Sequence, residues 1–292
     1  MNRPLFLLLG TGTMLGLNFP LGKMAIAAGV NPALWAAVIS LGAGLAMLAI
    51  TAAFENNSEK PSSIVKFSVI SGFLSFVVPN LITYTVIPKI GSGLAAIMFA
   101  LSPVVTALLS TIMRVRPPNA LGMIGIGLGL VGALVIILGR SASMETESSY
   151  WLLGALLIPV FLGLGNVYRT SAWPKNASPR KLASATNLAA VPFLLAVAVW
   201  QNASLDIAPL SKIPGLIALQ LLVSTCMFLM FFRLQQIGGP TYLSQIGYVA
   251  AAVGLIIGVF YFGEIYAITV WLGAGVVMLG IGFSTFGQLR QP

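Results

Sequence analysis

Histidine is absent from the sequence, and cysteine occurs once, as Cys226. Without histidine there is no histidine general base and no zinc motif of the His-Glu-x-x-His type. A single cysteine excludes an intrachain disulfide bond and a cysteine-cluster metal site. Because Cys226 lies in a long apolar run, we expect it to be buried among apolar side chains. No Walker A motif for nucleotide phosphates is present. We therefore expect no metal ion and no cofactor.

Acidic side chains are also scarce, and none lies in the middle of an apolar run. The six are Glu55, Glu59, Glu145, Glu147, Asp206 and Glu264. This placement excludes the paired carboxylates of a membrane protease. Together with the missing histidine, it predicts that the chain is not an enzyme.

Apolar residues make up 58% of the 292 residues and charged residues only 7%, against about 25% charged in soluble domains. So much apolar surface fits a lipid solvent, and continuous runs such as 121–138 indicate helices rather than the alternating strands of a barrel. We predict an all-α integral membrane protein with ten transmembrane helices. The ten runs are roughly 5–28, 33–54, 64–88, 92–114, 119–139, 150–172, 181–200, 213–236, 241–263 and 266–288.

The net charge of +9 would suggest a nucleic-acid partner on a soluble protein, but here the basic residues fall mostly between the apolar runs. We therefore interpret them as topology signals and expect no nucleic acid. With the N-terminus in the cytoplasm, eleven basic residues are cytoplasmic and three are external, which favours cytoplasmic positions for both termini. The eleven are Arg3, Lys60, Lys66, Arg114, Arg116, Arg169, Lys175, Arg180, Lys181, Arg233 and Arg290, and the three are Lys89, Arg140 and Lys212, with Lys23 alone taken as inside a span. Four tryptophans near the predicted outer ends are typical of an aromatic belt, namely Trp35, Trp151, Trp200 and Trp271.

The two halves of the sequence repeat one another. A shift of 148 residues places Asn18 on Asn166 and Val105 on Val253. The same shift places Gly125, Gly127 and Gly132 on Gly273, Gly275 and Gly280. We predict a first five-helix repeat at 1–140, a connecting loop at 141–149 and a second repeat at 150–292. Because five is odd, the second repeat must enter the membrane from the opposite side, which gives two inverted repeats as in many secondary transporters. The exchange of Arg116 for Glu264 at this shift agrees with inversion.

Several of these segments resemble the drug/metabolite transporter superfamily, in its ten-span EamA-like branch. The motifs are 16–23 (Gly-Leu-Asn-Phe-Pro-Leu-Gly-Lys), Pro32 at the start of the second span, the Pro-centred stretch 102–108, and the pair Gly263-Glu264. We expect Ser102-Pro103 to mark a kink in its span. The resemblance implies a ten-helix inverted repeat that moves metabolites, often amino acids, outward. The chain departs from the family pattern at Arg116, where a Glu is usual, and at Ala251, where a Pro is expected.

Polar groups inside the spans are the candidates for solute binding, because such groups are costly in lipid and usually face a cavity or another helix. Asn18 and Asn166 would flank the membrane midplane, and Pro20 frees a backbone carbonyl near Asn18. An interhelical hydrogen bond is the alternative role for each asparagine. The remaining candidates are amides, tyrosines and one lysine, namely Asn80, Tyr84, Gln245, Tyr248 and Lys23. Lys23 either attracts an anionic group or extends its amine to the outer interface.

These observations predict a secondary transporter that exports a small metabolite, an amino acid or a related amphipathic solute, by alternating access. The alternatives are a channel and a non-transporting membrane scaffold subunit. The expected partners are the small-molecule substrate and the lipid bilayer, and the expected location is the bacterial inner (plasma) membrane. The pairs Gly12/Gly16, Gly125/Gly129 and Gly254/Gly258 allow close helix approach, either inside the bundle or in a homodimer.

Overall fold

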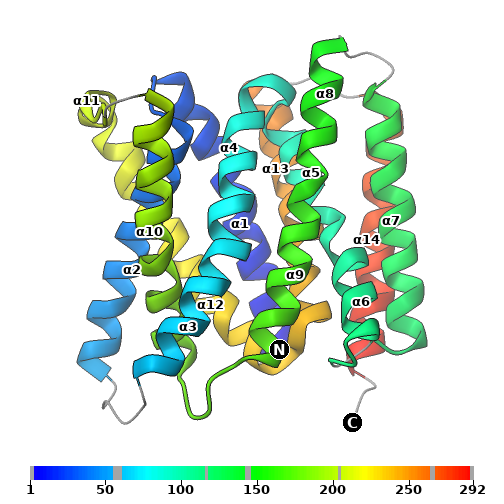
Figure 1. Cartoon of the computed structure of the whole chain (residues 1–292). Coiled ribbons are helices and arrows are strands. Elements are labelled where there is room, and N and C mark those ends of the chain that lie inside the picture. Colours follow the sequence, from blue (N-terminus) through cyan, green and yellow to red (C-terminus); the bar gives the residue numbers. More distant parts are fainter. Residues whose placement is uncertain are drawn as a thin grey trace.

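The computed structural model describes residues 3–54, 61–115, 118–141, 146–202, 205–263 and 267–289, and this part of the chain is helical without a β-strand (Figure 1). Long apolar segments form helices because only a helix satisfies every backbone polar group within its own segment. The helices are α1 (Arg3–Ala27), α2 (Pro32–Phe54), α3 (Pro61–Gly72), the π-helix η1 (Phe73–Val77), α4 (Val78–Ile90), α5 (Ser92–Ala100), α6 (Ser102–Ile112), α7 (Ala120–Ser141), α8 (Thr146–Ala155), α9 (Leu157–Ser171), α10 (Pro179–Asn202), α11 (Ala208–Ser211), α12 (Pro214–Ser244), α13 (Ile246–Phe262) and α14 (Ile268–Leu289).

Seven helical segments of the described chain are long and apolar enough to cross a membrane. They are Pro4–Ala27, Pro32–Ala53, Ser63–Ile90, Ser92–Ile112, Tyr150–Ser171, Pro179–Gln201 and Pro214–Ser244. Three shorter apolar helical segments follow the same pattern, Ala120–Gly132, Ile246–Phe262 and Ile268–Gly280. The predicted helical class is confirmed. The count of ten spans stays a prediction, because only seven segments of the described residues meet both the length and the hydropathy of a span.

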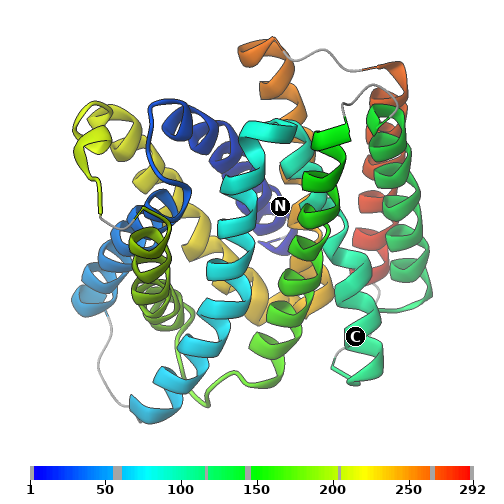
Figure 2. The same ribbon diagram turned by 45° about the horizontal axis from the view of Figure 1, so that its top comes forward.

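Several spans are interrupted where the sequence offers a reason. α5 ends at Ala100 and α6 begins at Ser102, one residue before Pro103, which lacks a backbone donor; this matches the kink expected there. In α12, Gly239 has φ of 72°, a left-handed conformation that glycine adopts without steric cost. Figures 1 and 2 show α12 running obliquely across the bundle from the end near α11 to the end near α9.

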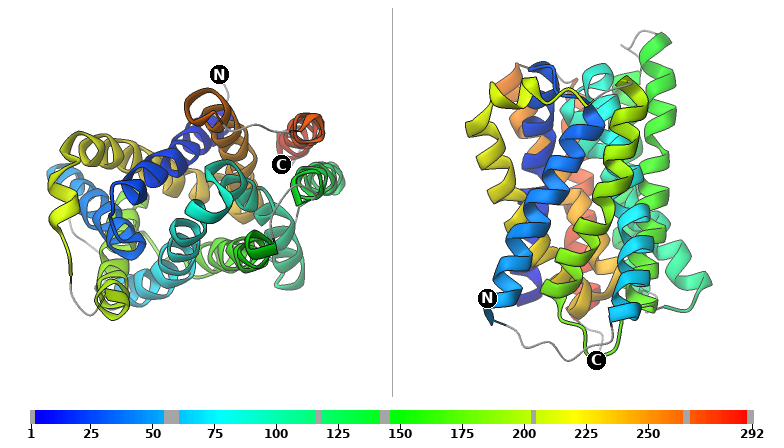
Figure 3. Two further views of the ribbon diagram at one scale, coloured as in Figure 1. Left: turned by 90° about the horizontal axis from the view of Figure 1, so that it is seen from above. Right: turned by 60° about the vertical axis from the view of Figure 1, so that its left-hand side comes forward.

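Helices from the two halves of the sequence pack in pairs. α2 packs on α10, α5 on α13, and α7 on α14. α1 packs on α12 and α13, while α9 packs on η1, α4 and α6. Figure 3, seen from above, places α7 and α14 side by side at one edge of the bundle and α2 and α10 at the opposite edge. Most large contacts therefore join one half of the chain to the other.

The contact between α7 and α14 is made by the repeated glycines. A Cβ at Gly132 would lie 2.6 Å from the carbonyl oxygen of Gly273, and a Cβ at Gly280 would lie 2.6 Å from that of Gly125. The higher-numbered glycine of each helix meets the lower-numbered glycine of the other, so the two helices are antiparallel. Only glycine allows the backbones to approach this closely.

The described ends of α1 and α14 lie at the same end of the bundle, the lower end in Figure 1 and in the right-hand view of Figure 3.

Two expectations from the sequence need correction. Trp35 is fully buried, so it packs in the core and does not join an aromatic belt, whereas Trp200 is 84% exposed. Cys226 on α12 is only partly buried, although burial among apolar side chains was expected. The exchanged pair Arg116 and Glu264 lies outside the described residues.

Candidate functional site: a central cavity between the two halves

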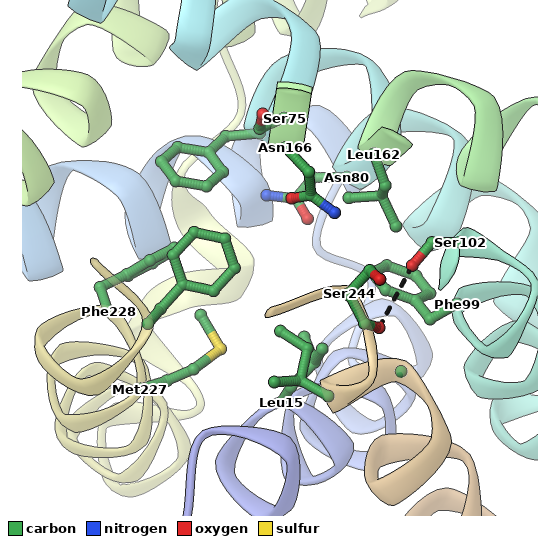
Figure 4. Close-up of a pocket in the computed structure, with 14 residues that line it drawn as sticks. Leu15, Ser75, Asn80, Phe99, Ser102, Leu162, Asn166, Met227, Phe228 and Ser244 are labelled. Carbon is green, nitrogen blue, oxygen red and sulfur yellow. Dashed lines mark hydrogen bonds between the residues drawn. The ribbon is translucent and has the colours of Figure 1, made fainter. Parts of the chain in front are cut away.

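A cavity of about 60 Å³ lies in the middle of the bundle (Figure 4). Helices from both halves of the sequence line it, and most of the lining is apolar. The lining residues are Leu15, Ser75, Phe76, Asn80, Phe99, Ser102, Leu162, Asn166, Met227, Phe228, Phe231, Ser244, Ile246 and Gly247. The volume holds a few water molecules and is well below the roughly 300–1,000 Å³ of ordinary ligand pockets. The cavity is therefore contracted, and a solute would need the surrounding helices to move apart.

The π-helix η1 brings two side chains to this cavity. Ser75 and Phe76 are both buried on η1 and both line the cavity. A π-helical turn inserts one extra residue and redirects the side chains around it, and such turns are frequent at functional sites. Phe76 then packs against Phe228, with ring centroids 4.8 Å apart, so an aromatic cluster borders this side of the cavity.

Asn80 lies on α4 between the central cavity and a smaller neighbouring cavity of about 30 Å³, and it lines both. Its amide makes no hydrogen bond to the described chain, and Figure 4 shows it beside Asn166 at the cavity wall. An amide without a protein partner in a mostly apolar cavity is available to bind a solute or water. The binding role of Asn80 stays a prediction.

Asn166 belongs to a polar cluster of α9, η1, α6 and α12 at the cavity wall. Its Nδ2 donates to Thr106 Oγ1 at 3.2 Å, and its Oδ1 accepts from Arg169 Nη2 at 2.5 Å. Arg169 also donates from Nη1 to Ser75 Oγ and from Nε to Gln235 Oε1, the latter at 3.2 Å. Gln235 completes the cluster by donating to the backbone oxygen of Asn166 at 3.1 Å. We call Asn166, Arg169, Gln235, Ser75 and Thr106 the arginine cluster.

The position of Arg169 corrects the sequence prediction. We counted it among the cytoplasmic basic residues, although the predicted span 150–172 includes it, and took Lys23 as the one basic residue inside a span. Arg169 instead lies within the span Tyr150–Ser171 and is 0% exposed. Its guanidinium also stacks on the ring of Phe231, 4.8 Å from the centroid. The spacing of three between Asn166 and Arg169, one helical turn, was the signal that could have identified it.

Asn18 belongs to a second polar cluster, formed by α1 and α12. Its Oδ1 accepts from Gln220 Nε2 and from Ser224 Oγ, the latter at 3.0 Å, and its Nδ2 donates to the backbone oxygen of Met14 at 2.7 Å. Gln220 is fully buried, and its Oε1 has no hydrogen-bond partner in the described chain. We call Asn18, Gln220 and Ser224 the neutral cluster. It borders the smaller cavity, which Asn18 and Tyr84 help to line.

Tyr84 and Lys23 lie toward the end of α1 opposite its first residue. Tyr84 is buried against Gly22, where a Cβ would overlap its ring. Lys23 does not line either cavity; its Nζ lies 4.2 Å from the centroid of Phe262, at the end of α13. A cation over an aromatic face is attracted by the ring quadrupole. This contact joins α1 to α13 beyond the cavities.

The structure brings together Asn18, Asn80 and Tyr84 at the smaller cavity, and Asn80 and Asn166 at the central one. It does not bring Tyr248 to either. Tyr248 is fully buried among residues of α5, α13 and α14, and its hydroxyl would overlap a Cβ at Gly129 of α7. Gln245 is also fully buried, between the last turn of α12 and the start of α13, beside but not in the lining.

Comparison with known proteins identifies the family. The model of the EamA-like transporter family matches residues 2–138 and again residues 149–286. The chain belongs to the EamA-like transporter family. The two matches support the drug/metabolite transporter superfamily, and the protein is an integral membrane protein of a transporter family rather than of an enzyme family.

The comparison with curated proteins gives no match. A solved structure, titled only as the crystal structure of a protein, superposes with a TM-score of 0.67 at 16% sequence identity. The match covers 94% of this chain and 98% of the other, so the two share a fold.

Among the described residues there is no group of three or more His, Cys, Asp or Glu side chains that could hold a metal ion.

Proposed function

We propose that this protein is a secondary transporter that moves small amphipathic metabolites, amino acids or related solutes, outward across the bacterial inner membrane by alternating access. The observation that carries the proposal is the central cavity, which is lined by both halves of the chain. Its apolar wall would hold an apolar body, and the amide of Asn80 offers an uncommitted polar contact. Because the cavity is contracted, we infer that the halves move relative to each other during transport.

The proposed architecture is ten spans in two inverted repeats, 1–140 and 150–292, joined by 141–149. The antiparallel glycine contact of α7 with α14 supports it. Two helices related by a half-turn about an axis in the membrane plane run antiparallel, so an early position of one helix meets a late position of the other. An axis along the membrane normal would make the two helices parallel. The family match in two segments, 2–138 and 149–286, is also consistent with this division.

We further propose that both termini are cytoplasmic, which is testable with single cysteines in a Cys226→Ala background. Lys175 and Asp206 are both exposed and lie in segments at opposite ends of α10. A cysteine at position 206 should react with an impermeant maleimide in intact cells, and one at 175 should react only after the membrane is opened. The reverse pattern would overturn the orientation.

Transport is proposed to run on the solute gradient or on exchange. Proton-coupled carriers commonly use a buried carboxylate or histidine. Asp206, the one acidic residue whose side chain the structure describes, is exposed, and Glu264 lies outside the described residues. Uptake that appears only under an imposed proton gradient, and that Glu264→Gln abolishes, would contradict this mechanism.

Counterflow in proteoliposomes tests the carrier itself. Vesicles loaded with an unlabelled apolar amino acid, such as leucine or phenylalanine, should accumulate the labelled form transiently and saturably. Asn80→Leu should reduce this counterflow several-fold, since it removes the free amide from the cavity. Gln236→Leu, which removes an exposed amide on α12, is the matched control and should transport normally. Linear flux without saturation would favour a channel, and no flux would favour a scaffold.

A further inference from the structure

Arg169 is a buried cation whose contacts in the described chain are all neutral. Its hydrogen-bond acceptors are Ser75, Asn166 and Gln235, and its only ring contact is Phe231. These three bonds use three of the five N–H groups of a guanidinium. No described carboxylate lies within ion-pair distance, in contrast to the usual rule that buried charges are paired.

A buried arginine without a counter-ion lowers the stability of the fold, so its presence points to a function. A charge removed from both water and counter-ion is strongly destabilising, and ionisable groups within spans are retained mainly where they act. Neutral hydrogen-bond partners offset part of this cost but supply no opposite charge. An interhelical tie alone could be made by neutral side chains, as the cluster of Asn18, Gln220 and Ser224 demonstrates.

The guanidinium lies directly behind the cavity wall. Three of the residues that contact it, Ser75, Asn166 and Phe231, are themselves lining residues of the central cavity. Figure 4 shows Ser75 and Asn166 together on one side of that wall. A solute would reach the guanidinium by displacing Ser75 or Asn166 from it.

We propose that Arg169 is the anion subsite of the transported solute and that the solute carries one carboxylate on an apolar body. This inference rests on the proposed carrier function and names its substrate class. One guanidinium balances one negative charge, whereas a phosphate dianion would leave an unpaired charge among the phenylalanine and leucine side chains of the lining. The apolar wall accommodates the body, and Asn80 binds a second polar group on it.

The test is a binding comparison on purified full-length protein. The probes are 3-phenylpropionate and 4-methylpentanoate, their uncharged amides, and phenyl phosphate as the dianion. Each carboxylate should bind roughly tenfold to a hundredfold more tightly than its amide and than phenyl phosphate, the range expected for charge-assisted hydrogen bonds. Equal binding of carboxylate and amide, or no binding of either carboxylate, would overturn the proposal. Equally tight binding of phenyl phosphate would overturn the monocarboxylate assignment.

Variants separate an anion site from a structural tie. Arg169→Gln should bind carboxylate and amide equally, and Arg169→Lys should keep part of the preference because the charge remains. Arg233→Gln removes an exposed arginine of α12 and should keep the full preference. A carboxylate preference that survives in folded Arg169→Gln would show that the residue is only structural. If Arg169→Gln does not fold, Arg169→Lys carries the test, and a carboxylate preference as strong as that of the wild type would contradict the assignment.

The outcomes also distinguish this inference from the carrier proposal. Saturable counterflow with no preference for carboxylates would leave the carrier standing and remove the anion subsite. Carboxylate binding that depends on Arg169, with no counterflow of any probe, would support the anion subsite and contradict the carrier.

Discussion

The neutral cluster and the arginine cluster occupy matched places in the repeated sequence but differ in charge. Asn18 and Asn166 are related by the 148-residue shift. Each is buried and accepts a hydrogen bond from a side chain of α12. One turn further along, the same shift pairs Leu21 with Arg169. The shift therefore relates one asparagine in each cluster, and only the second asparagine is followed one turn later by an arginine.

This difference has a functional consequence for a carrier. Two equal clusters would offer a solute the same contacts at the smaller cavity and at the central one. With one cation, an anionic group has a preferred end, near the last turn of α9. The repeated glycines of α7 and α14 would then allow the two halves to move relative to each other. Arg169, which has no counterpart in the first half, would orient the solute.

The largest effect is expected where the symmetric frame is broken. Gly132→Leu or Gly280→Leu would place a side chain against backbone atoms of the opposing helix, 2.6 Å away at the Cβ alone. We expect loss of most folded protein, because overpacking against backbone costs at least about 1–3 kcal/mol even for a few added methylenes. Size-exclusion chromatography and thermal melting measure this.

Gly127→Leu and Gly275→Leu are the matched controls, because nothing lies within 4 Å of a Cβ at either glycine. These variants should express and melt like the wild type. If all four variants have the same yield and melting temperature, the glycine contacts between α7 and α14 do not hold the halves together.

A smaller effect should follow from a single methyl group inside the arginine cluster. A Cβ at Gly165 would overlap Ser75 Oγ and lie 3.3 Å from Arg169 Nη1. Gly165→Ala should therefore lower stability by about 1–3 kcal/mol and weaken carboxylate binding. Gly154→Ala, on the exposed face of α8 with nothing within 4 Å, should be neutral or slightly stabilising. An equally stable Gly165→Ala with unchanged binding would contradict the described contact between η1 and α9.

The smallest stability effect is expected in the neutral cluster. Asn18→Ala removes the acceptor of Gln220 and Ser224, and a lost hydrogen bond between membrane helices costs about 0.6–2 kcal/mol. Carboxylate preference should not change, because the charge lies in the other cluster. A melting curve and the same pair of probes measure both. Loss of the preference in Asn18→Ala would show that the two clusters act as one site.

Sequence reasoning succeeded where the signal was continuous and failed where it depended on contacts between distant residues. Long apolar runs predicted the helices, and Pro103 predicted the break between α5 and α6. The bonds of Gln220 to Asn18, 202 residues apart, could not be predicted because hydropathy does not say which helices pack together. For the same reason Tyr248 was expected at the solute cavity, although the structure places it against α7 and α14.

Arg169 was counted as cytoplasmic because it lies two residues before the end of its span, and basic residues at span ends are usually topology signals. The neighbouring pattern of Gly163, Gly165 and Asn166 on one helix was the available clue. Gly165 lets η1 approach α9 closely beside the guanidinium, and Gly163 lets α6 approach the same helix.

The most direct test of alternating access is a pair of distance measurements between spin labels, made in lipid with Cys226 replaced by alanine. One label pair, Lys89 and Tyr261, reports on the exposed ends of α4 and α13; the other, Lys66 and Gln236, reports on α3 and α12 at the opposite end of the bundle. When 3-phenylpropionate is added, one distance should lengthen as the other shortens. Two distances that stay fixed, or that change in the same direction, would contradict a carrier that opens to one side at a time.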